Sequence, residues 1–423
     1  MTSEEIGLVF QREAGQVLAT LIRLLGDFDL AEEALQEAFE IALKRWAGSV
    51  PPANPRAWLI RAARNRAIDQ LRRRARFERE RPALDAEAAL AAEPEIASES
   101  GVGVGALEDD VLRLIFTCCH PALPMEARVA LTLRTVCGLT TGEVARGFLV
   151  ADEAMAQRLV RAKTKIRAAH IPYRVPPLEM LDERVDGVLA VLYLVFTEGY
   201  AATSSDSEAR RGLAAEAIRL ARLIDRLMPG PAIKGLLALM LLQDARRAAR
   251  ATPDGDVVLL EDQDRKLWDQ GQIAEGLLLV EAALTTPGPP SSYAVQAAIA
   301  ALHVRARSQA ETDWPQIAGL YAVLARIQPS PVIELNRAVA VSMVDGPARA
   351  LELVDALIAR GELAGYHLAP AVRADLLRRL GRPAEAAEAY RTALVLARQE
   401  SEKRLLARRL LELGDGSHQT GIQ

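Results

Sequence analysis

Residues 30–44 read LAEEALQEAFEIALK, and residues 57–74 read AWLIRAARNRAIDQLRRR. The first stretch predicts an amphipathic helix with an acidic outer surface, because its apolar side chains recur at helical spacing between the acids. Asp27 and Asp29 lie at the start of that helix, where an aspartate side chain can cap the helix N-terminus. The second stretch predicts a helix that packs by one face and projects arginines from the other. Two neighbouring helices of opposite charge therefore dominate the N-terminal part of the chain.

The composition predicts an all-α protein. The 423-residue chain is 50% hydrophobic but only 4% aromatic, and alanine and leucine dominate, which favours helices over strands. Its length predicts two to four domains of about 100–200 residues. Three cysteines argue against a disulfide framework and indicate a reducing compartment. The longest apolar stretch, 188–196, is about half of a membrane span, and the N-terminus lacks a signal peptide, so we expect a cytoplasmic protein without a membrane partner.

Local charge divides the chain although the net charge is only −4. Between Arg56 and Arg81 there are ten arginines and three acids, a basic stripe suited to phosphate. Residues 82–110 then hold eight acids and no lysine or arginine, which predicts a flexible linker. Proline-rich residues 171–177 mark a second boundary. We therefore predict domains at 1–81, 111–174 and 175–423, with the linker at 82–110.

Residues 111–174 predict a helix-turn-helix, with helices at 124–136, 141–147 and 152–167. Thr140 or Thr141 caps the second of these helices, and Asp152 the third. In this motif the last helix enters the major groove of DNA, and its basic residues grip phosphate. Met155, Leu159 and Ile166 are expected in the hydrophobic core. The expected base-contacting residues are Asp152, Glu153, Ala154, Ala156, Gln157 and Arg158. The expected phosphate contacts are Arg161, Lys163, Lys165 and Arg167.

The N-terminal motifs resemble region 2 of the extracytoplasmic-function (ECF) sigma factors, which give bacterial RNA polymerase its promoter specificity. The resemblance is carried by residues 27–39, 54–59 and 64–73. It implies that Glu33, Gln36 and Glu37 dock on the β′ clamp helices of core RNA polymerase. It also implies that the 51–58 loop and the arginine helix open and bind the −10 promoter element. The DNA-binding residues that it assigns are Trp58, Arg61, Arg64, Asn65, Arg72 and Arg73. For Trp58, an ordinary core position is an equal alternative.

Residues 123–167 are similar to region 4 of the same sigma factors, which binds the −35 element; Ala154 and Ala156 depart from the family pattern. The long C-terminal segment resembles that of an ECF subgroup with a helical extension like tetratricopeptide repeats (TPR). Its glycines at 346 and 381 lie about one TPR period of ~34 residues apart, and those at 271 and 381 lie about three periods apart. The resemblance implies a sigma factor with a fused regulatory domain. Such a protein is not an enzyme and needs no cofactor. An irregular helical array with accidental glycine spacing is the alternative for the C-terminal segment.

Three features of the sequence allow more than one interpretation. The Cys118-Cys119-His120 triplet could suggest a metal, but buried thiols at a helix end are the simpler interpretation, and we expect no metal site. Polar residues embedded in apolar helices form either structural networks or a groove for a regulatory protein or ligand. They are Glu198, Tyr200, Asp262, Gln263, Asp264, Arg265, Asn336 and Arg337. The competing functions are a scaffold that binds nucleic acid non-specifically and an enzyme within the C-terminal domain, although no catalytic motif is present.

Overall fold

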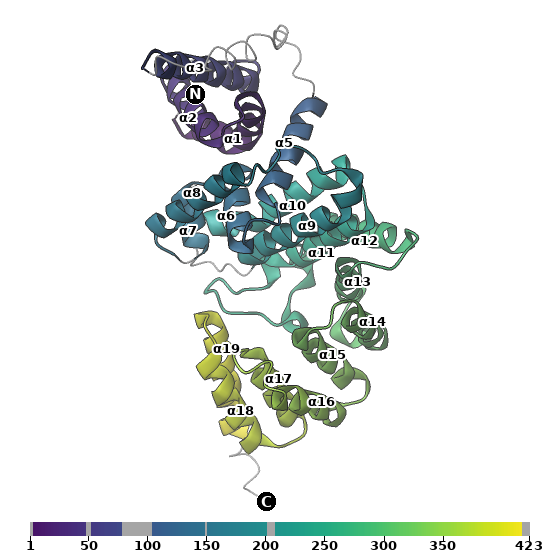
Figure 1. The fold of residues 1–423 in the computed structure, drawn as a ribbon. Helices are drawn as coiled ribbons and strands as arrows, with labels where there is room; N and C mark the ends of the chain where they lie inside the picture. Colours follow the sequence, from purple (N-terminus) through teal and green to yellow (C-terminus); the bar gives the residue numbers. More distant parts are fainter. Residues whose placement is uncertain (1–2, 48–51, 78–103, 149, 201–207, 417–423) are drawn as a thin grey trace, which may run out of the picture. The chain divides into compact units, whose positions relative to one another are not determined.

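A computed structural model describes residues 3–47, 52–77, 104–148, 150–200 and 208–416. Across these ranges the chain is helical, and the β-structure found there is an isolated bridge between Ala251 and Val257. The all-α prediction is therefore confirmed (Figure 1). No helix in the described ranges is long and apolar enough to cross a membrane.

The chain divides into two compact units. The first comprises residues 1–199 and 207–228, and the second comprises 200–206 and 229–423. The sequence-based boundary at 175 is therefore too early, because helices α9 (Leu178–Tyr200) and α10 (Glu208–Leu227) belong almost entirely to the first unit. One reason is that Arg184 of α9 is buried and donates a hydrogen bond of 2.6 Å to the carbonyl oxygen of Phe116.

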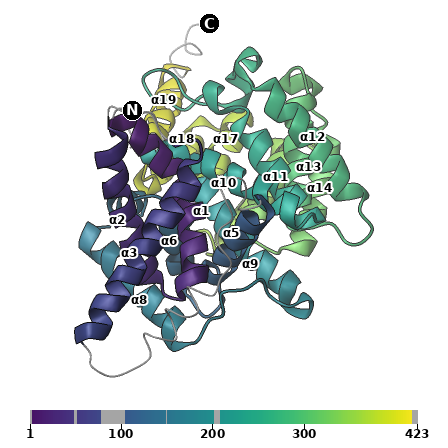
Figure 2. The ribbon, with the colours of Figure 1, turned by 90° about the horizontal axis from the view of Figure 1, so that it is seen from above.

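Helices α1 (Ser3–Leu25), α2 (Phe28–Trp46) and α3 (Pro55–Phe77) form the N-terminal bundle, in which they lie side by side (Figure 2). Alanines at helical spacing allow the close approach; Ala31, Ala34, Ala38 and Ala42 of α2 are all fully buried. Asp27 caps α2 by accepting a hydrogen bond of 2.9 Å from the Leu30 amide. Asp29 instead lies in the first turn of the helix.

Helix α5 (Val104–Cys118) begins inside the segment predicted as linker, so residues 104–110 are helical. Asp110, which we assigned to the acidic linker, is buried against α1. Its carboxylate accepts hydrogen bonds from Thr20, Arg23 and Arg113 at 2.8 to 3.1 Å. A buried carboxylate is stable when it is paired in this way. The rest of the predicted linker that precedes residue 104 lies outside the described residues.

Helices α6 (Met125–Thr135), α7 (Thr141–Gly147) and α8 (Asp152–Ala168) confirm the predicted succession of three helices. Thr140 and Glu143 form a capping box at the start of α7, because each side chain accepts a hydrogen bond from the other's backbone amide. The predicted Asp152 cap is wrong. Ala151 occupies the cap position without a side-chain bond, and Asp152 is the first helical residue.

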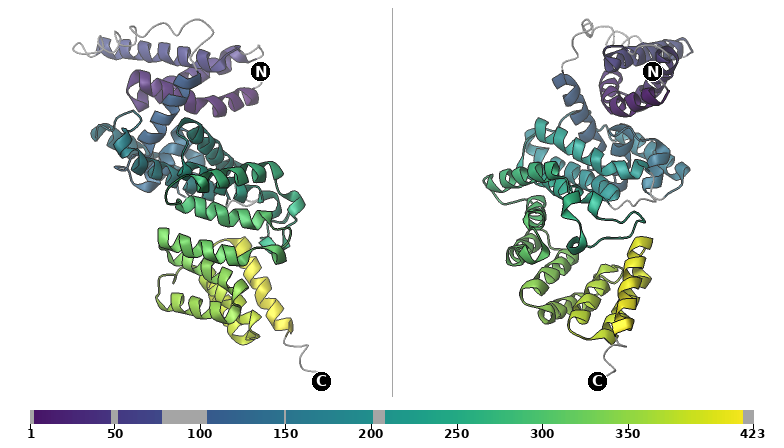
Figure 3. Two further views of the ribbon diagram at one scale, coloured as in Figure 1. Left: turned by 90° about the vertical axis from the view of Figure 1, so that its right-hand side faces the viewer. Right: turned by 180° about the vertical axis from the view of Figure 1, so that it is seen from behind.

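The second unit is built from consecutive helices that pack on their neighbours (Figure 3). Gly346 and Gly381 have positive φ angles, 88° and 69°, at the turns that begin two of these helices, where glycine is favoured. Tyr390 and Ala393 are buried in the hydrophobic core that the C-terminal helices share. Its helices are α11 (Pro231–Asp244), α12 (Gln270–Thr285), α13 (Ser292–Arg305), α14 (Trp314–Ile327), α15 (Pro331–Val344), α16 (Pro347–Ala359), α17 (Leu368–Arg379), α18 (Pro383–Leu396) and α19 (Glu400–Gly416).

The polar stretch 262–265 has a structural role in the second unit. Arg265 donates to the carbonyl oxygens of His303 and Ala306 at 3.2 and 2.9 Å, so it satisfies the C-terminal end of α13. Asp264 accepts a hydrogen bond from the backbone of Lys266. Asn336, in contrast, is exposed on α15. For Asp264 and Arg265, the structural-network interpretation is therefore supported over a ligand groove.

We expect the second unit to lose stability on acidification through His303. Burial and the charges of Arg246 and Arg265 lower the pKa of His303 to about 4, below the ordinary 6.5. Between these values the unfolded chain binds more protons, so stability falls as the pH falls, by about 2 kcal/mol at pH 5. Thermal unfolding at pH 7.5 and pH 5.0 should show a smaller acid-induced loss for His303→Gln than for the wild type. An equal loss in both proteins would contradict this role.

Candidate nucleic-acid interface

Helix α2 presents the acidic surface that the sequence predicted. Its apolar face is buried, whereas Glu33, Gln36 and Glu40 are exposed, one helical turn apart. Glu37 lies differently. Its carboxylate accepts a hydrogen bond of 2.8 Å from the Gln70 amide and lies 3.8 Å from the Arg66 guanidinium, both on α3. Of the three residues predicted to dock on polymerase, two therefore face outward, and Glu37 also joins α2 to α3.

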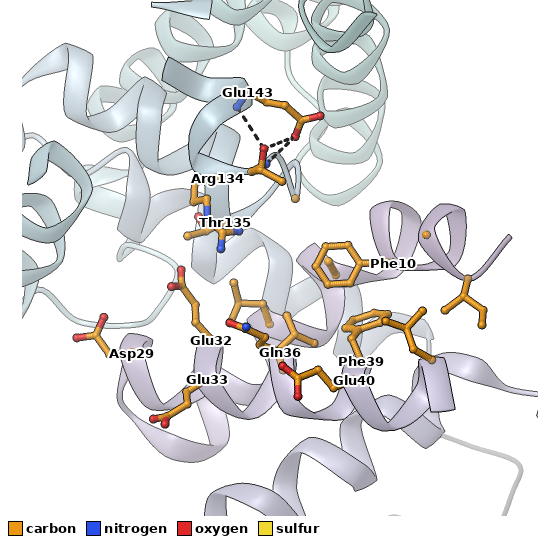
Figure 4. Close-up of a pocket in the computed structure, with 18 residues that line it drawn as sticks. Phe10, Asp29, Glu32, Glu33, Gln36, Phe39, Glu40, Arg134, Thr135 and Glu143 are labelled. Carbon is orange, nitrogen blue, oxygen red and sulfur yellow. Dashed lines mark hydrogen bonds between the residues drawn. The ribbon is translucent and has the colours of Figure 1, made fainter. Parts of the chain in front are cut away.

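A groove of about 980 Å³ runs between this surface of α2, helix α1 and the α6–α7 turn (Figure 4). Its apolar floor includes Phe10 and Phe39, whose rings pack edge to face with their centres 4.1 Å apart. Across the groove from α2 lie Arg134 and Glu143. The acidic residues that line it are Asp29, Glu32, Glu33, Glu40 and Glu143. The groove thus combines an apolar floor with a strongly acidic rim.

The start of α3 is held by contacts that the sequence analysis missed. The Asn54 side chain accepts a hydrogen bond of 3.0 Å from the Ala57 amide and so caps the helix. Arg56, counted above in the basic stripe, donates to Glu13 of α1 at 2.6 Å. The ring of Trp58 lies 5.1 Å from that of Trp46, which is buried. Trp58 is itself half-buried, so it combines a packing contact with partial exposure.

The outer face of α3 carries several of the predicted DNA-binding residues. Arg61, Asn65 and Arg72 are exposed, and Arg64 is half-buried. Arg73 belongs to α3, but its side chain lies outside the described residues. Arg61, Asn65 and Arg72 follow each other at intervals of four and seven residues, so they share one side of the helix. This side provides two cations and one amide, the groups that bind phosphate and base edges.

Helix α8 buries the expected core residues and exposes five of the six expected base contacts; the sixth, Arg158, is half-buried. Met155, Leu159 and Ile166 are buried, and Ala162 completes the same face. Asp152, Glu153, Ala154, Ala156 and Gln157 are exposed. The Arg158 guanidinium lies 5.6 Å from the ring centre of Phe148, which limits its freedom. The N-terminal half of α8 is therefore accessible to a partner.

The basic residues of α8 fall on two sides of the helix, which the sequence analysis did not distinguish. Arg161 and Lys165 are exposed and lie four residues apart. Lys163 and Arg167 lie about 200° away around the helix and face α2. The Lys163 ammonium donates to Glu32 at 2.7 Å and to Asp29 at 3.3 Å. Arg167 donates to Asp29 at 2.7 Å. Two predicted phosphate contacts are thus paired with acidic residues of the same chain.

The adjacent cysteines are part of the hydrophobic core. Cys118 and Cys119 are buried, and their sulfurs lie 3.2 and 3.6 Å from the hydroxyls of Thr135 and Thr132. Burial raises the pKa of Cys119 to about 11 and that of Cys118 still further. Both groups are therefore neutral thiols at pH 7. In the part of the chain that the structure describes, no group of three metal-binding side chains is found.

Comparison with known families identifies the N-terminal bundle. Residues 9–77, which run from α1 to the end of α3, match the family described as Sigma-70 region 2. Sigma-70 proteins are transcription initiation factors rather than enzymes, and their region 2 contacts RNA polymerase core and promoter DNA. The bundle with its acidic and basic helices is thus a sigma factor domain.

The similarity extends well beyond this domain. The chain is 46% identical over 392 residues to an uncharacterized protein of Rhizobium meliloti (strain 1021), spanning 92% of this chain and 90% of that protein. It belongs to the same family as this rhizobial protein. Residues 184–284 also match a family of unknown function, DUF6596. That match covers helices of both compact units.

Proposed function

We propose that this protein is an ECF-type sigma factor that directs promoter-specific transcription initiation and carries a regulatory, TPR-like helical domain at its C-terminus. One observation supports it most: the region 2 bundle is followed by a second set of helices, α6–α8, whose last member exposes polar and basic side chains. A sigma factor needs two DNA-binding elements to recognise two promoter elements. A non-specific scaffold needs neither this order nor this exposure.

In this proposal each helix has a separate task. The exposed Glu33 and Gln36 of α2 dock on the β′ clamp helices of core polymerase, and Glu37 supports them through α3. The exposed side of α3 binds the −10 element. The N-terminal half of α8 contacts bases of the −35 element, while Arg161 and Lys165 bind phosphate. Such contacts need no cofactor, and the energy for initiation comes from binding.

Selection of DNA by the reconstituted complex tests the proposal. Core polymerase and the full-length protein would be mixed with random duplex DNA, and the bound fraction sequenced. The proposal predicts two enriched motifs at a constant separation, absent with core polymerase alone. Enrichment of no motif would favour the non-specific scaffold, and enrichment of a single motif would contradict recognition of two promoter elements.

We expect Arg158→Ala and Arg161→Ala to have different effects on DNA binding. Loss of a base contact by Arg158 should weaken binding to the selected −35 sequence by about 1 to 3 kcal/mol and flatten specificity. Loss of a phosphate contact by Arg161 should weaken binding to selected and random DNA evenly and reduce the salt dependence. Titration of both variants on both DNAs, at two salt concentrations, measures the difference. Parallel losses for the two variants on both DNAs would remove the base-contact assignment.

A further inference from the structure

Helices α2 and α8 bind each other through side chains that lie next to the surfaces that the proposed function assigns to other partners. Lys163 is only 12% exposed, and its ammonium lies between Glu32 and Asp29. Arg167 extends the cluster, at 2.7 Å from Asp29 and 4.0 Å from Asp27. Glu32 directly precedes Glu33 and lies one turn before Gln36 on α2. The cluster therefore adjoins the proposed polymerase-docking residues.

Two further contacts join the same parts of the first unit. Asp110, at the base of the helix-turn-helix segment, is only 2% exposed and binds Thr20 and Arg23 of α1. Gly15 of α1 lies so close to the turn after α6 that an added Cβ would clash with the Val136 carbonyl oxygen. The bundle α1–α3 and the segment α5–α8 are thus closely packed on each other.

The dimensions of promoter DNA conflict with this packing. The −10 and −35 elements are about 25 base pairs apart, which is about 85 Å along the duplex. Helix α3 packs on α2, and the ion pairs of Lys163 and Arg167 join α8 to α2, so both DNA-binding helices adjoin one helix that is only about 30 Å long. One copy of this packed unit cannot span both elements at once.

We infer that the ion pairs of Lys163 and Arg167 with Asp29 and Glu32 form an intramolecular latch, which keeps the free sigma factor closed and competes with polymerase docking. The inference rests on the proposed function for the identity of the competing partner. The latch pairs cationic side chains of the DNA-binding helix with carboxylates beside the docking surface. Until the unit opens, the cations cannot bind DNA, and the docking surface cannot bind polymerase. Opening on polymerase then exposes Lys163 and Arg167 for phosphate.

The two pairs should respond differently to salt. Arg167 and Asp29 are about 60% exposed, so dissolved ions screen their attraction. Lys163 and Glu32 are 12% and 21% exposed, so their attraction is screened much less. Lys163 and Glu32 are therefore the dominant pair, and moderate salt alone does not open the latch.

A distance measurement on the full-length chain tests the closed state. Spin labels on Ala47→Cys at the end of α2 and Ala168→Cys at the end of α8 use two exposed positions outside the latch. Cys118 and Cys119 are buried, and the half-buried Cys137 would be replaced by serine in the labelled proteins. We expect one short distance in the free protein and a much longer one in the complex with core polymerase and promoter DNA. A long distance in the free protein, or a short one in the complex, would overturn the inference.

Charge exchange tests the latch itself. Lys163→Glu with Arg167→Glu should lengthen or broaden the distance distribution, and adding Asp29→Lys with Glu32→Lys should restore the short distance. Arg161→Glu with Lys165→Glu is the matched control, because it reverses two charges on the opposite side of α8 and should leave the distance unchanged. If the three variants give the same distribution as the parent chain, ion pairs do not hold the closed state.

Competition with polymerase is measured with Asp29→Asn and Glu32→Gln, which lie outside the assigned docking and DNA-binding sets. Opening the latch raises the fraction of competent molecules, so the affinity for core polymerase should rise by about fivefold to tenfold. An unchanged affinity for core polymerase would show that the latch does not compete with polymerase docking. If neither the parent chain nor this variant binds polymerase, the proposed function fails instead, and the distance measurement still decides whether the latch exists.

Discussion

Replacement of Glu33, Gln36 and Glu37 by alanine is expected to abolish binding to core polymerase at concentrations where the parent chain is saturated. Truncation of a small group of central interface residues commonly costs 2 kcal/mol or more, so we expect an affinity loss of at least about thirtyfold. Two of the side chains are exposed, and α2 keeps its buried alanine face, so the fold should survive. The affinity would be measured by fluorescence anisotropy of labelled protein.

The structure supplies two controls for this experiment. Glu37→Ala alone removes the contact with Gln70 and Arg66, so it reports the part of the loss that comes from the α2–α3 packing. Glu126→Ala removes an exposed acid from the first turn of α6, away from α2, and should bind polymerase like the parent chain. Normal binding by a folded triple variant would show that α2 does not dock.

Removal of residues 229–423 is expected to abolish promoter-dependent transcription. The DUF6596 match extends from residue 184 to residue 284, so the matched segment includes helices of both units, and we expect both units to be needed. The cut belongs after Met228 because α9 and α10 are part of the first unit. A cut near Pro176, at the boundary predicted from sequence, would remove the buried Arg184 and expose the residues it packs on.

Transcription by full-length and truncated protein at equal concentration decides this prediction. Circular dichroism must first show that the truncated protein retains its helices. Equal activity of the two proteins would mean that the C-terminal helices have no part in initiation, and higher activity of the truncated protein would mean that they inhibit it.

Periodicity and capping residues made the helices predictable. Local patterns were enough to place α2 after Asp27 and α7 after Thr140, because a cap depends on residues three positions apart. The buried face of α8 followed from its 3.6-residue spacing for the same reason. The Sigma-70 region 2 match confirms the class suggested by the N-terminal motifs.

Long-range pairing could not be predicted from the sequence. Asp110 looked like one more acid in an acidic segment, and nothing local indicated that it would meet Thr20 and Arg23 some ninety residues away. Lys163 and Lys165 are equivalent by composition, yet one faces Glu32 and the other is exposed. Their difference depends on which side of α8 meets α2, and the packing of distant helices decides that.

Initiation from a defined start site decides whether this chain is a promoter-specific sigma factor. Core RNA polymerase would transcribe a linear template that carries the selected pair of motifs, with and without the full-length protein. We expect a discrete transcript only when the protein is present. The transcript should be lost with the Glu33, Gln36 and Glu37 triple variant, and when either motif is scrambled. Transcript yield that is independent of the protein, or of the motifs, would contradict the assignment of this chain as a promoter-specific sigma factor.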